Sequence, residues 1–286
     1  MLFSFIGLGK MGTPLARNIM NAGEELMVYA RTASHAAPFG EAGARVTTSL
    51  EELAECDVLC TCLPLPHHVT DFVLGSDGAS GLYASMKPGS IHVEFSTIDP
   101  GTAERMATAA REYGIAYVQC TVGKTPAMAA KCEEPLFIGG DRAAVEKLMP
   151  VFQKIGQPRD VDTVVASCAV KLLSNLIGMT NLAVLAEGMR IGQIAGMDLH
   201  QLIELLQDTG ARSFQLDVRG PWIASEDFES RFDVDIAVKD MTLGCSMAES
   251  WGFSPVLMDH AREAFVRASQ EGYGKEDGCA VVKIMR

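Results

Sequence analysis

The sequence predicts an α/β protein in which an N-terminal Rossmann domain, a doubly wound parallel sheet, is followed by an all-α C-terminal domain joined by a long helix. Short apolar runs recur through the first half of the chain, and segments of helical periodicity separate the first of them. This alternation builds a parallel sheet covered by helices. Strand signals stop after Val164, and a proline-free segment with helical spacing then runs from Cys168 to Ala195. Its length and its apolar residues on several sides indicate the buried central helix of a helical domain.

Strands are expected at six apolar runs: Leu2–Gly7, Leu26–Ala30, Asp57–Leu63, Ser90–Phe95, Ala116–Cys120 and Leu136–Gly139. After the long helix, further helices are expected at Leu199–Thr209, Ile236–Trp251 and Pro255–Glu271, with breaks at Gly210, Gly220-Pro221 and Gly252. No disordered linker separates the two halves, so the long helix itself makes the junction. We therefore expect a Rossmann dinucleotide-binding domain over residues 1–164 and a substrate and oligomerisation domain over 165–286.

Composition excludes several classes of function. The 24 lysines and arginines against 36 aspartates and glutamates leave a net charge of −12, which nucleic acid or an anionic lipid surface would repel. No basic n-region precedes the apolar N-terminus, and no run approaches the roughly 18 apolar residues of a spanning helix. Neither nucleic acid nor a membrane is expected as a partner, and the expected location is the cytoplasm.

Cysteines and histidines predict no metal site. The eight cysteines form no CxxC pair and no disulfide framework, so they are interpreted as reduced thiols. The six histidines offer no metal-binding spacing. His67 and His68 could touch the nicotinamide or the substrate, but two histidines in a loop are more often solvated.

A glycine-rich turn follows the first expected strand. Gly7-Leu8-Gly9-Lys10-Met11-Gly12 is a G-x-G-x-x-G that ends a strand and opens a helical pattern. Gly7 allows the tight turn, Gly9 lets a pyrophosphate approach the backbone, and Gly12 lets the helix pack closely on the strand. The turn predicts a dinucleotide site, with a purely structural glycine turn as the alternative.

The end of the second strand indicates which dinucleotide binds. An NAD-selective site usually has an acidic residue there to accept the ribose 2′-hydroxyl, but this strand ends in Ala30-Arg31-Thr32. Arg31 would pair with a 2′-phosphate through a charge-assisted fork, and Thr32 could add a hydroxyl. NADP(H) is therefore favoured over NAD(H), although Arg31 could also be a solvated loop residue.

With these residues placed, the sequence resembles the β-hydroxyacid dehydrogenase family, which includes 3-hydroxyisobutyrate dehydrogenase and tartronate semialdehyde reductase. Five segments carry the resemblance over essentially the whole chain: Gly7–Gly12 (G-L-G-x-M-G), Leu63-Pro64 (M-L-P), Glu94–Pro100 (D-x-S-T-x-x-P), Lys171–Asn175 (K-x-x-N-N) and Val238–Met241 (K-D-L). The resemblance implies a Rossmann domain, a connecting helix, an all-α domain and a homodimer or homotetramer.

The resemblance also implies roles for individual residues. Lys171 resembles the catalytic lysine that donates a proton to the substrate carbonyl oxygen as hydride arrives, and Asn175, one helical turn later, would hold the substrate or the lysine. A positive group is required where alkoxide charge develops. Leu63, Pro64, Thr97 and Lys239 would contact the cofactor, and Ser96 the substrate side of the pocket. Lys171 as a lysine at a helix end, and Lys239 as a surface residue beside Asp240, are the alternatives.

The sequence departs from this family in the segment expected to bind the substrate anion. Most members have D-A-P-V-S-G-G there, whereas this chain has Gln119–Thr125, ending in Gly123-Lys124-Thr125. Backbone amides, a cation and a hydroxyl suit a tetrahedral sulfonate or phosphonate as well as a carboxylate. The loop resembles the V-G-R-T of 3-sulfolactaldehyde reductases, with lysine for arginine. Two further departures are the absence of glycine from Val165–Val170 and Ser174 in place of an asparagine.

The sequence thus predicts an NADPH-dependent reductase that converts a small anionic aldehyde to the hydroxyacid. An imine reductase shares the architecture implied by the resemblance, but such enzymes usually replace the lysine that this chain retains as Lys171. A non-catalytic NADP-binding scaffold is the alternative from another class. Such relatives tend to lose the lysine too and often carry a basic extension.

Overall fold

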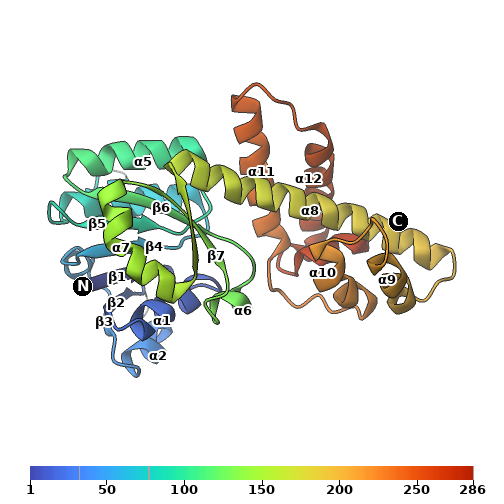
Figure 1. The fold of residues 1–286 in the computed structure, drawn as a ribbon, viewed down its shortest axis with the longest axis horizontal. Helices are drawn as coiled ribbons and strands as arrows, with labels where there is room; N and C mark the ends of the chain where they lie inside the picture. The colour runs from blue at the N-terminus through green and yellow to red at the C-terminus, as the bar shows by residue number, and fades with distance from the viewer. Residues whose placement is uncertain (32, 77, 286) are drawn as a thin grey trace. The chain divides into compact units, whose positions relative to one another are not determined.

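The structure is a computed structural model that describes residues 1–31, 33–76 and 78–285 (Figure 1). The described chain forms two compact units, unit 1 over Met1–Lys171 and unit 2 over Leu172–Arg286. The boundary expected from the sequence, after residue 164, lies at the first turn of the helix that runs from unit 1 into unit 2.

Unit 1 is built on an eight-stranded sheet with the order β3-β2-β1-β4-β5-β6-β7-β8. The strands are β1 (Leu2–Ile6), β2 (Glu25–Tyr29), β3 (Arg45–Thr47), β4 (Val58–Thr61), β5 (Ile91–Glu94), β6 (Ala116–Val122), β7 (Pro135–Gly140) and β8 (Gln157–Asp162). Neighbours from β3 to β6 pair in parallel, whereas β7 pairs antiparallel with β6 and parallel with β8. The predicted Rossmann sheet is confirmed, with two strands of reversed direction added at one edge.

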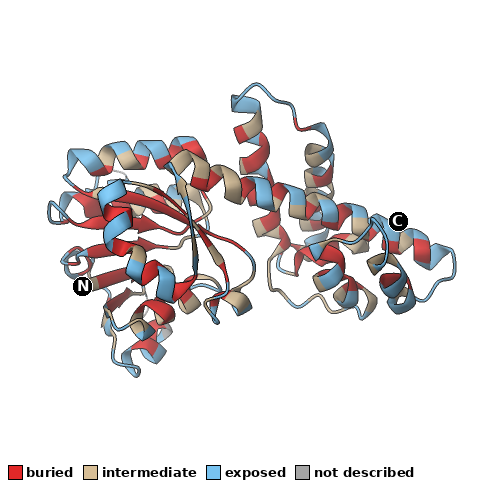
Figure 2. Ribbon diagram, viewed as in Figure 1, coloured by how far each residue is buried: buried red, intermediate tan, exposed pale blue. Residues whose placement is uncertain are grey.

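Helices cover both faces of this sheet (Figure 1). They are α1 (Gly12–Asn21), α2 (Ala37–Gly40), α3 (Leu50–Leu53), α4 (Pro66–Leu74), α5 (Pro100–Glu112), α6 (Pro126–Ala129) and α7 (Arg142–Ile155). Apolar side chains of α1 and α7 share one core with Phe3 and Phe5 of β1. Side chains of α3, α4 and α5 share a second core with Ile6, on the opposite face. The central strands β1, β4, β5 and β6 are therefore buried on both sides, as Figure 2 shows.

Unit 2 is helical, as predicted. It contains most of α8 (Val164–Ile194), then α9 (Leu199–Gln207), α10 (Phe214–Ala224), α11 (Val234–Ser250) and α12 (Val256–Ala268), followed by a π-helical segment (Ser269–Tyr273) and a 3₁₀ segment (Gly278–Ile284). Leu176, Leu182 and Met189 of α8 belong to the core of this unit.

Three sequence expectations about the elements were wrong. The sequence analysis missed β3, which has three residues, and β8, whose Gln-Pro-Arg-Asp-Val-Asp sequence has no apolar run because it is a largely solvent-exposed strand at the end of the sheet. Gly220-Pro221 was expected to break a helix but lies inside α10. Packing of the helix against the core outweighs the local cost of these two residues.

α8 is long and apolar enough, by length and composition alone, to cross a membrane, with 31 residues and a mean hydropathy of 1.5 in its most apolar window. Cys168 at its start packs in a core of unit 1, and Leu176 and Leu182 pack in the core of unit 2. Core helices of soluble proteins pass the same test, so α8 is weak evidence for a membrane.

Candidate dinucleotide and substrate site

The carboxyl ends of four parallel strands meet at one edge of the sheet in unit 1. The register pairs Ile6 of β1 with Tyr29 of β2 and with Thr61 of β4, and it pairs Thr61 with Glu94 of β5. The loops after these strands therefore lie along the same edge. Because β1 lies between β2 and β4, the strand order reverses there. Open α/β sheets bind their ligands in the crevice at such a point.

The predicted glycine turn joins β1 to α1. Gly7 has a φ of +101°, and a Cβ on it would lie 2.1 Å from the carbonyl oxygen of Cys62. A Cβ on Gly12 would lie 1.8 Å from the carbonyl oxygen of Gly7, whereas a Cβ on Gly9 would meet no described atom within 4 Å. Gly7 and Gly12 are therefore needed to close the turn, and Gly9 leaves the space that a pyrophosphate requires. The turn also contains Leu8, Lys10 and Met11.

The N-terminus of α1 differs from those of three other helices of the protein. Within the described residues, no side chain caps α1 and its first turn contains no acidic residue. By contrast, the side chains of Asp99, Asp141 and Asp198 cap α5, α7 and α9. The hydroxyl of Thr13 donates to the carbonyl oxygen of Leu8 at 3.1 Å and fixes the turn. Amides at an uncapped helix start suit a pyrophosphate, so the residues present fit a dinucleotide.

Arg31 follows β2 with an exposed side chain, and Thr32 lies outside the described residues. His68, in the first turn of α4, has a lowered pKa because it is partly buried, and the positive charges of His67 and Arg31 add to this effect. The end of β2 and the start of α4 therefore lie close together. His67 and His68 are in a helix rather than a loop, with ring centroids 4.4 Å apart.

Buried polar bonds connect the Leu63-Pro64 loop to the loop after β5. The amide of Leu63 donates to Oγ of Ser96 at 2.7 Å, and the amide of Ser96 donates to Oε1 of Glu94 at 2.6 Å. The other carboxyl oxygen of Glu94 accepts from the hydroxyl of Thr61 at 2.5 Å. Ser96 is 3% exposed and Glu94 is fully buried. The contact of Ser96 with substrate and that of Thr97 with cofactor remain predictions.

A chain of hydrogen bonds continues behind Glu94. Oγ1 of Thr61 lies 2.7 Å from Nε2 of His92, and Nδ1 of His92 lies 2.6 Å from the hydroxyl of Tyr83. Burial raises the pKa of Glu94 to about 7 and lowers the pKa of His92 to about 3. His92 is therefore neutral at physiological pH, while Glu94 changes its charge near neutrality. The sequence analysis used Glu94 only as part of a motif and missed this network.

The loop after β6 contains the predicted anion-binding residues. A Cβ on Gly123 would lie 2.5 Å from Cγ of Pro135, and the Gly123 amide donates to the Pro135 carbonyl at 2.9 Å. Lys124 has a φ of +59°, and its ammonium donates to the carbonyl oxygen of Glu133 at 3.3 Å. Thr125 precedes the first residue of α6. Because the Gly123 amide is bonded within the protein, the donors expected for a substrate anion are chiefly the Lys124 ammonium and the Thr125 hydroxyl.

Glu134 is a second buried carboxyl group that the sequence analysis missed. Its side chain is fully buried, and neither carboxyl oxygen has a hydrogen-bond partner among the described residues. Burial raises the pKa of Glu134 to about 7, and the positive charge of Lys124 acts in the opposite direction. The positive charge of Lys124 therefore lowers the pKa of the Glu134 carboxyl group, which lies close to it.

In unit 2, one carboxylate holds two of the predicted residues. The amide nitrogen of Asn175 on α8 donates to Oδ2 of Asp240 on α11 at 2.5 Å, and Nζ of Lys239 lies 2.7 Å from Oδ1 of the same residue. Asp240 is 1% exposed, and the Lys239 side chain is 14% exposed. Lys239 is therefore not an ordinary surface lysine. Asp240 was not predicted as a site residue, although it belongs to the K-D-L segment. Lys171, the last residue of unit 1, is half-buried and lies one turn before Asn175 on α8.

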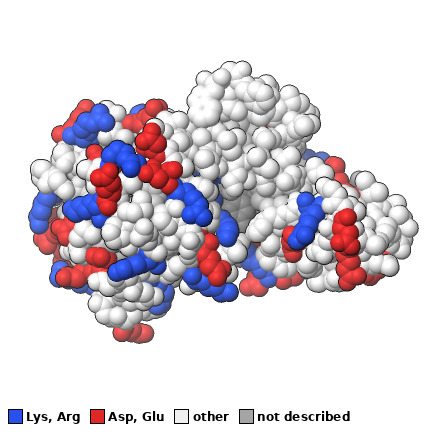
Figure 3. Space-filling model, in the orientation of Figure 1, with Lys and Arg blue, Asp and Glu red and all other residues white. Residues whose placement is uncertain are grey.

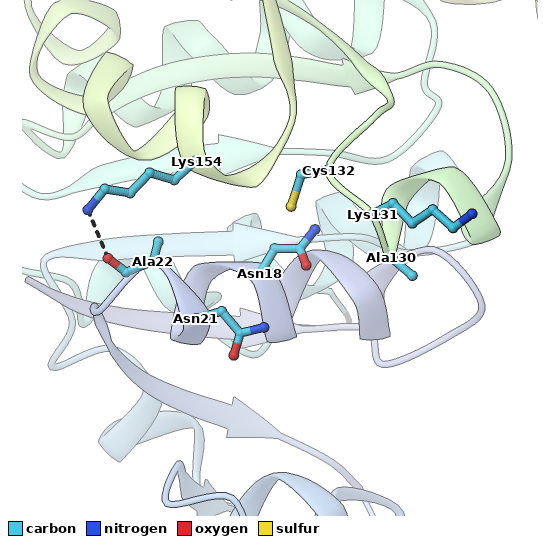
Figure 4. Close-up of a pocket in the computed structure, with 7 residues that line it drawn as sticks. All are labelled: Asn18, Asn21, Ala22, Ala130, Lys131, Cys132 and Lys154. Atoms are coloured by element: carbon cyan, nitrogen blue, oxygen red, sulfur yellow. Dashed lines mark hydrogen bonds between the residues drawn. The ribbon is translucent and has the colours of Figure 1, made fainter.

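A separate pocket of about 310 Å³ lies near the C-terminal ends of α1 and α7 (Figure 4). None of the predicted site residues lines it. Lys154 donates from its ammonium to the carbonyl oxygen of Ala22 at 3.0 Å, and Asn18 donates to the carbonyl oxygen of Ala129 at 2.7 Å. Its lining consists of Asn18, Asn21, Ala22, Ala130, Lys131, Cys132 and Lys154. Asn18 and Lys154 donate to the protein backbone rather than into the pocket, so this pocket is a weaker candidate site than the carboxyl ends of the strands.

Two protein-family models together match almost the whole chain. The NAD binding domain of 6-phosphogluconate dehydrogenase matches residues 2–170, and the NAD-binding domain of NADP-dependent 3-hydroxyisobutyrate dehydrogenase matches residues 166–285. The second model agrees with the predicted cofactor, NADP(H).

Individual relatives are similar over nearly the whole length of this chain. An NAD-dependent L-serine dehydrogenase of Pseudomonas aeruginosa is 30% identical over 295 residues, which cover 98% of this chain and 96% of that protein. Glyoxylate/succinic semialdehyde reductase 2 of Arabidopsis thaliana, a chloroplastic protein, is 27% identical over 99% of this chain and 78% of its own length. The solved structure of 3-hydroxyisobutyrate dehydrogenase from Salmonella typhimurium matches with a TM-score of 0.89 and 28% identity, over 99% of each chain. These similarities confirm the predicted fold class.

Proposed function

Because the chain belongs to the β-hydroxyacid dehydrogenase family and is an NAD(P)-dependent oxidoreductase, we propose that it reduces a small anionic aldehyde to the hydroxyacid with NADPH. The observation that carries this proposal is the coexistence in one chain of the open glycine turn at Gly9 and the Lys171, Asn175 pair on α8. The first is a place for a dinucleotide, and the second supplies a proton donor with a polar neighbour one turn away.

The preference for NADP(H) over NAD(H) rests on the end of β2. Arg31 stands there in place of the carboxylate that would accept a ribose 2′-hydroxyl, and a guanidinium pairs with a 2′-phosphate through charge-assisted bonds. His68 lies close enough to sense the charge of Arg31. An anion placed beside Arg31 would therefore also favour the protonated form of His68.

When bound, the nicotinamide supplies the hydride. In the proposed reaction, Lys171 donates a proton to the carbonyl oxygen as negative charge develops there, and it accepts that proton in the opposite direction. Asn175 holds the substrate or the Lys171 ammonium by hydrogen bonding. Asp240 accepts from the Asn175 amide and pairs with Lys239, so it fixes the direction of both side chains. Asp240 is therefore proposed as a positioning residue rather than a catalytic one.

The substrate is proposed to be a short aldehyde or hydroxyacid with one anionic group. The named relatives act on L-serine and on glyoxylate or succinic semialdehyde, all of which are small and carry a carboxylate. Lys124 and Thr125 would bind the anion. Lys124 occupies a left-handed backbone conformation that favours glycine, at a cost of roughly 1 kcal/mol, so its side chain is expected to have a task. A tetrahedral sulfonate, as in sulfolactaldehyde, is the second candidate anion.

Two other functions are less well supported. An imine reductase or a non-catalytic NADP-binding scaffold would not need Lys171 beside Asn175, and this chain keeps both, together with the buried Asp240 that holds Asn175. Tight NADPH binding with no turnover of any aldehyde would favour one of these alternatives.

We further propose that the protein is a cytoplasmic homodimer or homotetramer that associates through unit 2. Large apolar side chains are exposed along α8, between α11 and α12 and at the start of α12: Leu173, Ile177, Val184, Ile191, Trp251, Phe253, Val256 and Leu257. Figure 3 shows no charged side chain, in that view, where α11 and α12 are joined. Large exposed apolar side chains favour a protein interface, and a second copy of the chain would bury them.

The test of the proposed function is the loss of NADPH absorbance, with NADH in parallel, against five aldehydes: succinic semialdehyde, glyoxylate, methylmalonate semialdehyde, tartronate semialdehyde and 3-sulfolactaldehyde. Wild type should turn over at least one of them with a preference for NADPH, and Lys171→Ala should not. The best aldehyde would distinguish a carboxylate from a sulfonate at Lys124. Absence of turnover on the whole panel, with NADPH bound, would contradict the proposal.

A further inference from the structure

We propose that Glu94 is a positioning residue that couples cofactor binding to pH: in its ionised form it fixes the Leu63-Pro64 and Ser96-Thr97 loops, and its protonation loosens them. This inference rests on the proposed function, because it takes these two loops to be the ones that contact the nicotinamide cofactor.

One carboxyl group controls the backbone of both loops. Oε1 of Glu94 accepts the amide hydrogen of Ser96 at 2.6 Å, and the hydroxyl oxygen of the same Ser96 accepts the amide hydrogen of Leu63 at 2.7 Å. A bond from an amide to a carboxylate is charge-assisted and about twice as strong as a bond to a neutral acceptor. The position of Leu63 therefore depends, through Ser96, on the charge of Glu94.

The groups behind Glu94 allow two hydrogen-bonding arrangements. When Glu94 is ionised, it can only accept, so Thr61 donates to it, Nε2–H of His92 donates to Thr61, and Tyr83 donates to Nδ1. When Glu94 carries a proton on Oε2, it donates to Thr61, which donates to Nε2, and Nδ1–H donates to Tyr83. Both arrangements keep these three contacts without moving a heavy atom. The second gives Ser96 a neutral acceptor and leaves the Tyr83 hydroxyl hydrogen without an acceptor among these groups.

Burial and the bonds from Ser96 and Thr61 determine the pKa of Glu94, and no cation among the described residues contributes to it. The titratable groups that face it are Cys60 of β4, Tyr83 before β5, His92 of β5, Tyr117 of β6 and Cys168 of α8. Burial raises the pKa of the four thiols and phenols and lowers that of His92, so all are neutral near pH 7. Burial raises the pKa of Glu94 to about 7 against the bonds from Ser96 and Thr61. Within this cluster of described residues, Glu94 is therefore the group that titrates near neutrality.

The test is the dissociation constant of NADPH, measured by its fluorescence at pH 6, 7 and 8 for wild type and Glu94→Gln. The 2′-phosphate of NADPH also titrates in this range, but it does so equally for both proteins, so the ratio of their dissociation constants removes it. The dissociation constant of Glu94→Gln divided by that of wild type should be about one at pH 6, where both proteins present a neutral acceptor to Ser96. It should rise to about five at pH 8, where only wild type presents a carboxylate. A ratio that does not change with pH would overturn the proposal.

Three further variants keep the test decisive. Glu134→Gln removes another buried carboxyl group that has no bond to either loop, and its ratio to wild type should be constant. Glu94→Asp retains a titratable carboxyl group and should retain the pH dependence. Thr61→Val removes one donor to the ionised carboxylate and should move the transition to higher pH, which decides the question if Glu94→Gln does not fold.

The outcomes separate this inference from the proposed function. A pH-dependent ratio without turnover of any aldehyde would leave the role of Glu94 standing and contradict the proposed reaction. Turnover of an aldehyde with a ratio that does not change with pH would support the proposed reaction and contradict the role of Glu94. If wild type does not bind NADPH, both are wrong.

Discussion

The two groups of site residues are held in different ways. In unit 1, the glycine turn and the loops after β4 and β5 are fixed by close backbone approaches and by buried hydrogen bonds that end on Glu94. In unit 2, Asn175 and Lys239 are held by a single buried side chain, Asp240. A substitution where two backbone segments are in close contact forces the backbone to move and alters the fold. A substitution at a side chain that is held only by a carboxylate leaves the backbone in place. We therefore expect changes in the first group to affect folding or cofactor binding, and changes around α8 to affect turnover alone.

The largest expected effect is on turnover. Lys171→Ala should lower kcat about 10³-fold, because general acid catalysis typically contributes 10²–10⁴, while the dissociation constant of NADPH and the melting temperature stay close to wild type. Steady-state kinetics and NADPH titration measure the two quantities separately. Lys147→Ala, an exposed lysine on α7, is the matched control and should change neither. Weakened NADPH binding in Lys171→Ala would break the distinction between the two groups.

The glycine turn should show the opposite behaviour. Gly12→Ala places a Cβ 1.8 Å from the carbonyl oxygen of Gly7, so the backbone must shift, and we expect unfolding free energy to fall by about 3 kcal/mol. Gly9→Ala meets no described atom and should leave stability unchanged while weakening NADPH binding at least tenfold. Urea unfolding and NADPH titration of this pair test the turn directly. Equal stability losses in both variants would contradict the geometry.

Glu134 is an exception within unit 1, because it is buried without hydrogen-bond partners. Its folded pKa, about 7, lies above the ordinary value of 4.5, so the folded state favours the protonated form. The stability from this preference is present below pH 4.5 and is lost as pH rises through about 7. Glu134→Leu should therefore stabilise the protein by about 2 kcal/mol at pH 8 and by less at pH 5. Glu133→Gln, at an exposed neighbour, should show no such dependence.

A smaller effect is expected from Asp240→Asn. The change removes the charge that holds Asn175 and Lys239, and we expect kcat to fall about tenfold, with little change in NADPH affinity. Asp259→Asn, which breaks the more exposed ion pair with Arg262 on α12, is the control and should leave kcat unchanged. A loss of stability in Asp240→Asn as large as that of Gly12→Ala would show that unit 2 holds its site residues as rigidly as unit 1.

The smallest expected effect is at Lys124, where two substitutions distinguish the backbone strain of this residue from its role in anion binding. Lys124→Gly should raise the unfolding free energy by about 1 kcal/mol, because φ is +59° there, and should raise KM for the anionic aldehyde with little change in kcat. Lys124→Ala loses the same charge but keeps most of the backbone strain, so it should raise KM without the gain in stability. An unchanged KM in both variants would exclude Lys124 from anion binding.

The sequence alone was sufficient for the parts of the fold and site that depend on local pattern. The apolar runs predicted six strands, and the spacing of Gly7, Gly9 and Gly12 predicted a turn whose close contacts the structure confirms. β3 and β8 were missed because their pairing, and not an apolar run, makes them strands. Gly220-Pro221 in α10 was misassigned because packing outweighed propensity.

The buried carboxyl groups could not have been identified from sequence, because their surroundings come from distant segments. Glu94 depends on Thr61 and on His92 with Tyr83, and Asp240 depends on Asn175, which is 65 positions away. Glu134 is unusual because it is buried with no hydrogen-bond partner among the described residues, and no local sequence pattern indicates this. The sequence identified Lys124 as a departure from the family that the chain resembles, but only the structure shows that its φ is in the left-handed region.

The central claim, hydride transfer to a carbonyl with Lys171 as proton donor, is tested most directly by following deuterium. NADPH that carries deuterium at both C4 positions of the nicotinamide is incubated with each aldehyde of the panel, and the product is analysed by mass spectrometry and NMR. Wild type should yield a hydroxyacid one mass unit heavier, with the deuterium on the carbinol carbon, and Lys171→Ala should yield almost none in the same time. Product without deuterium, or equal labelling by the two proteins, would contradict the account.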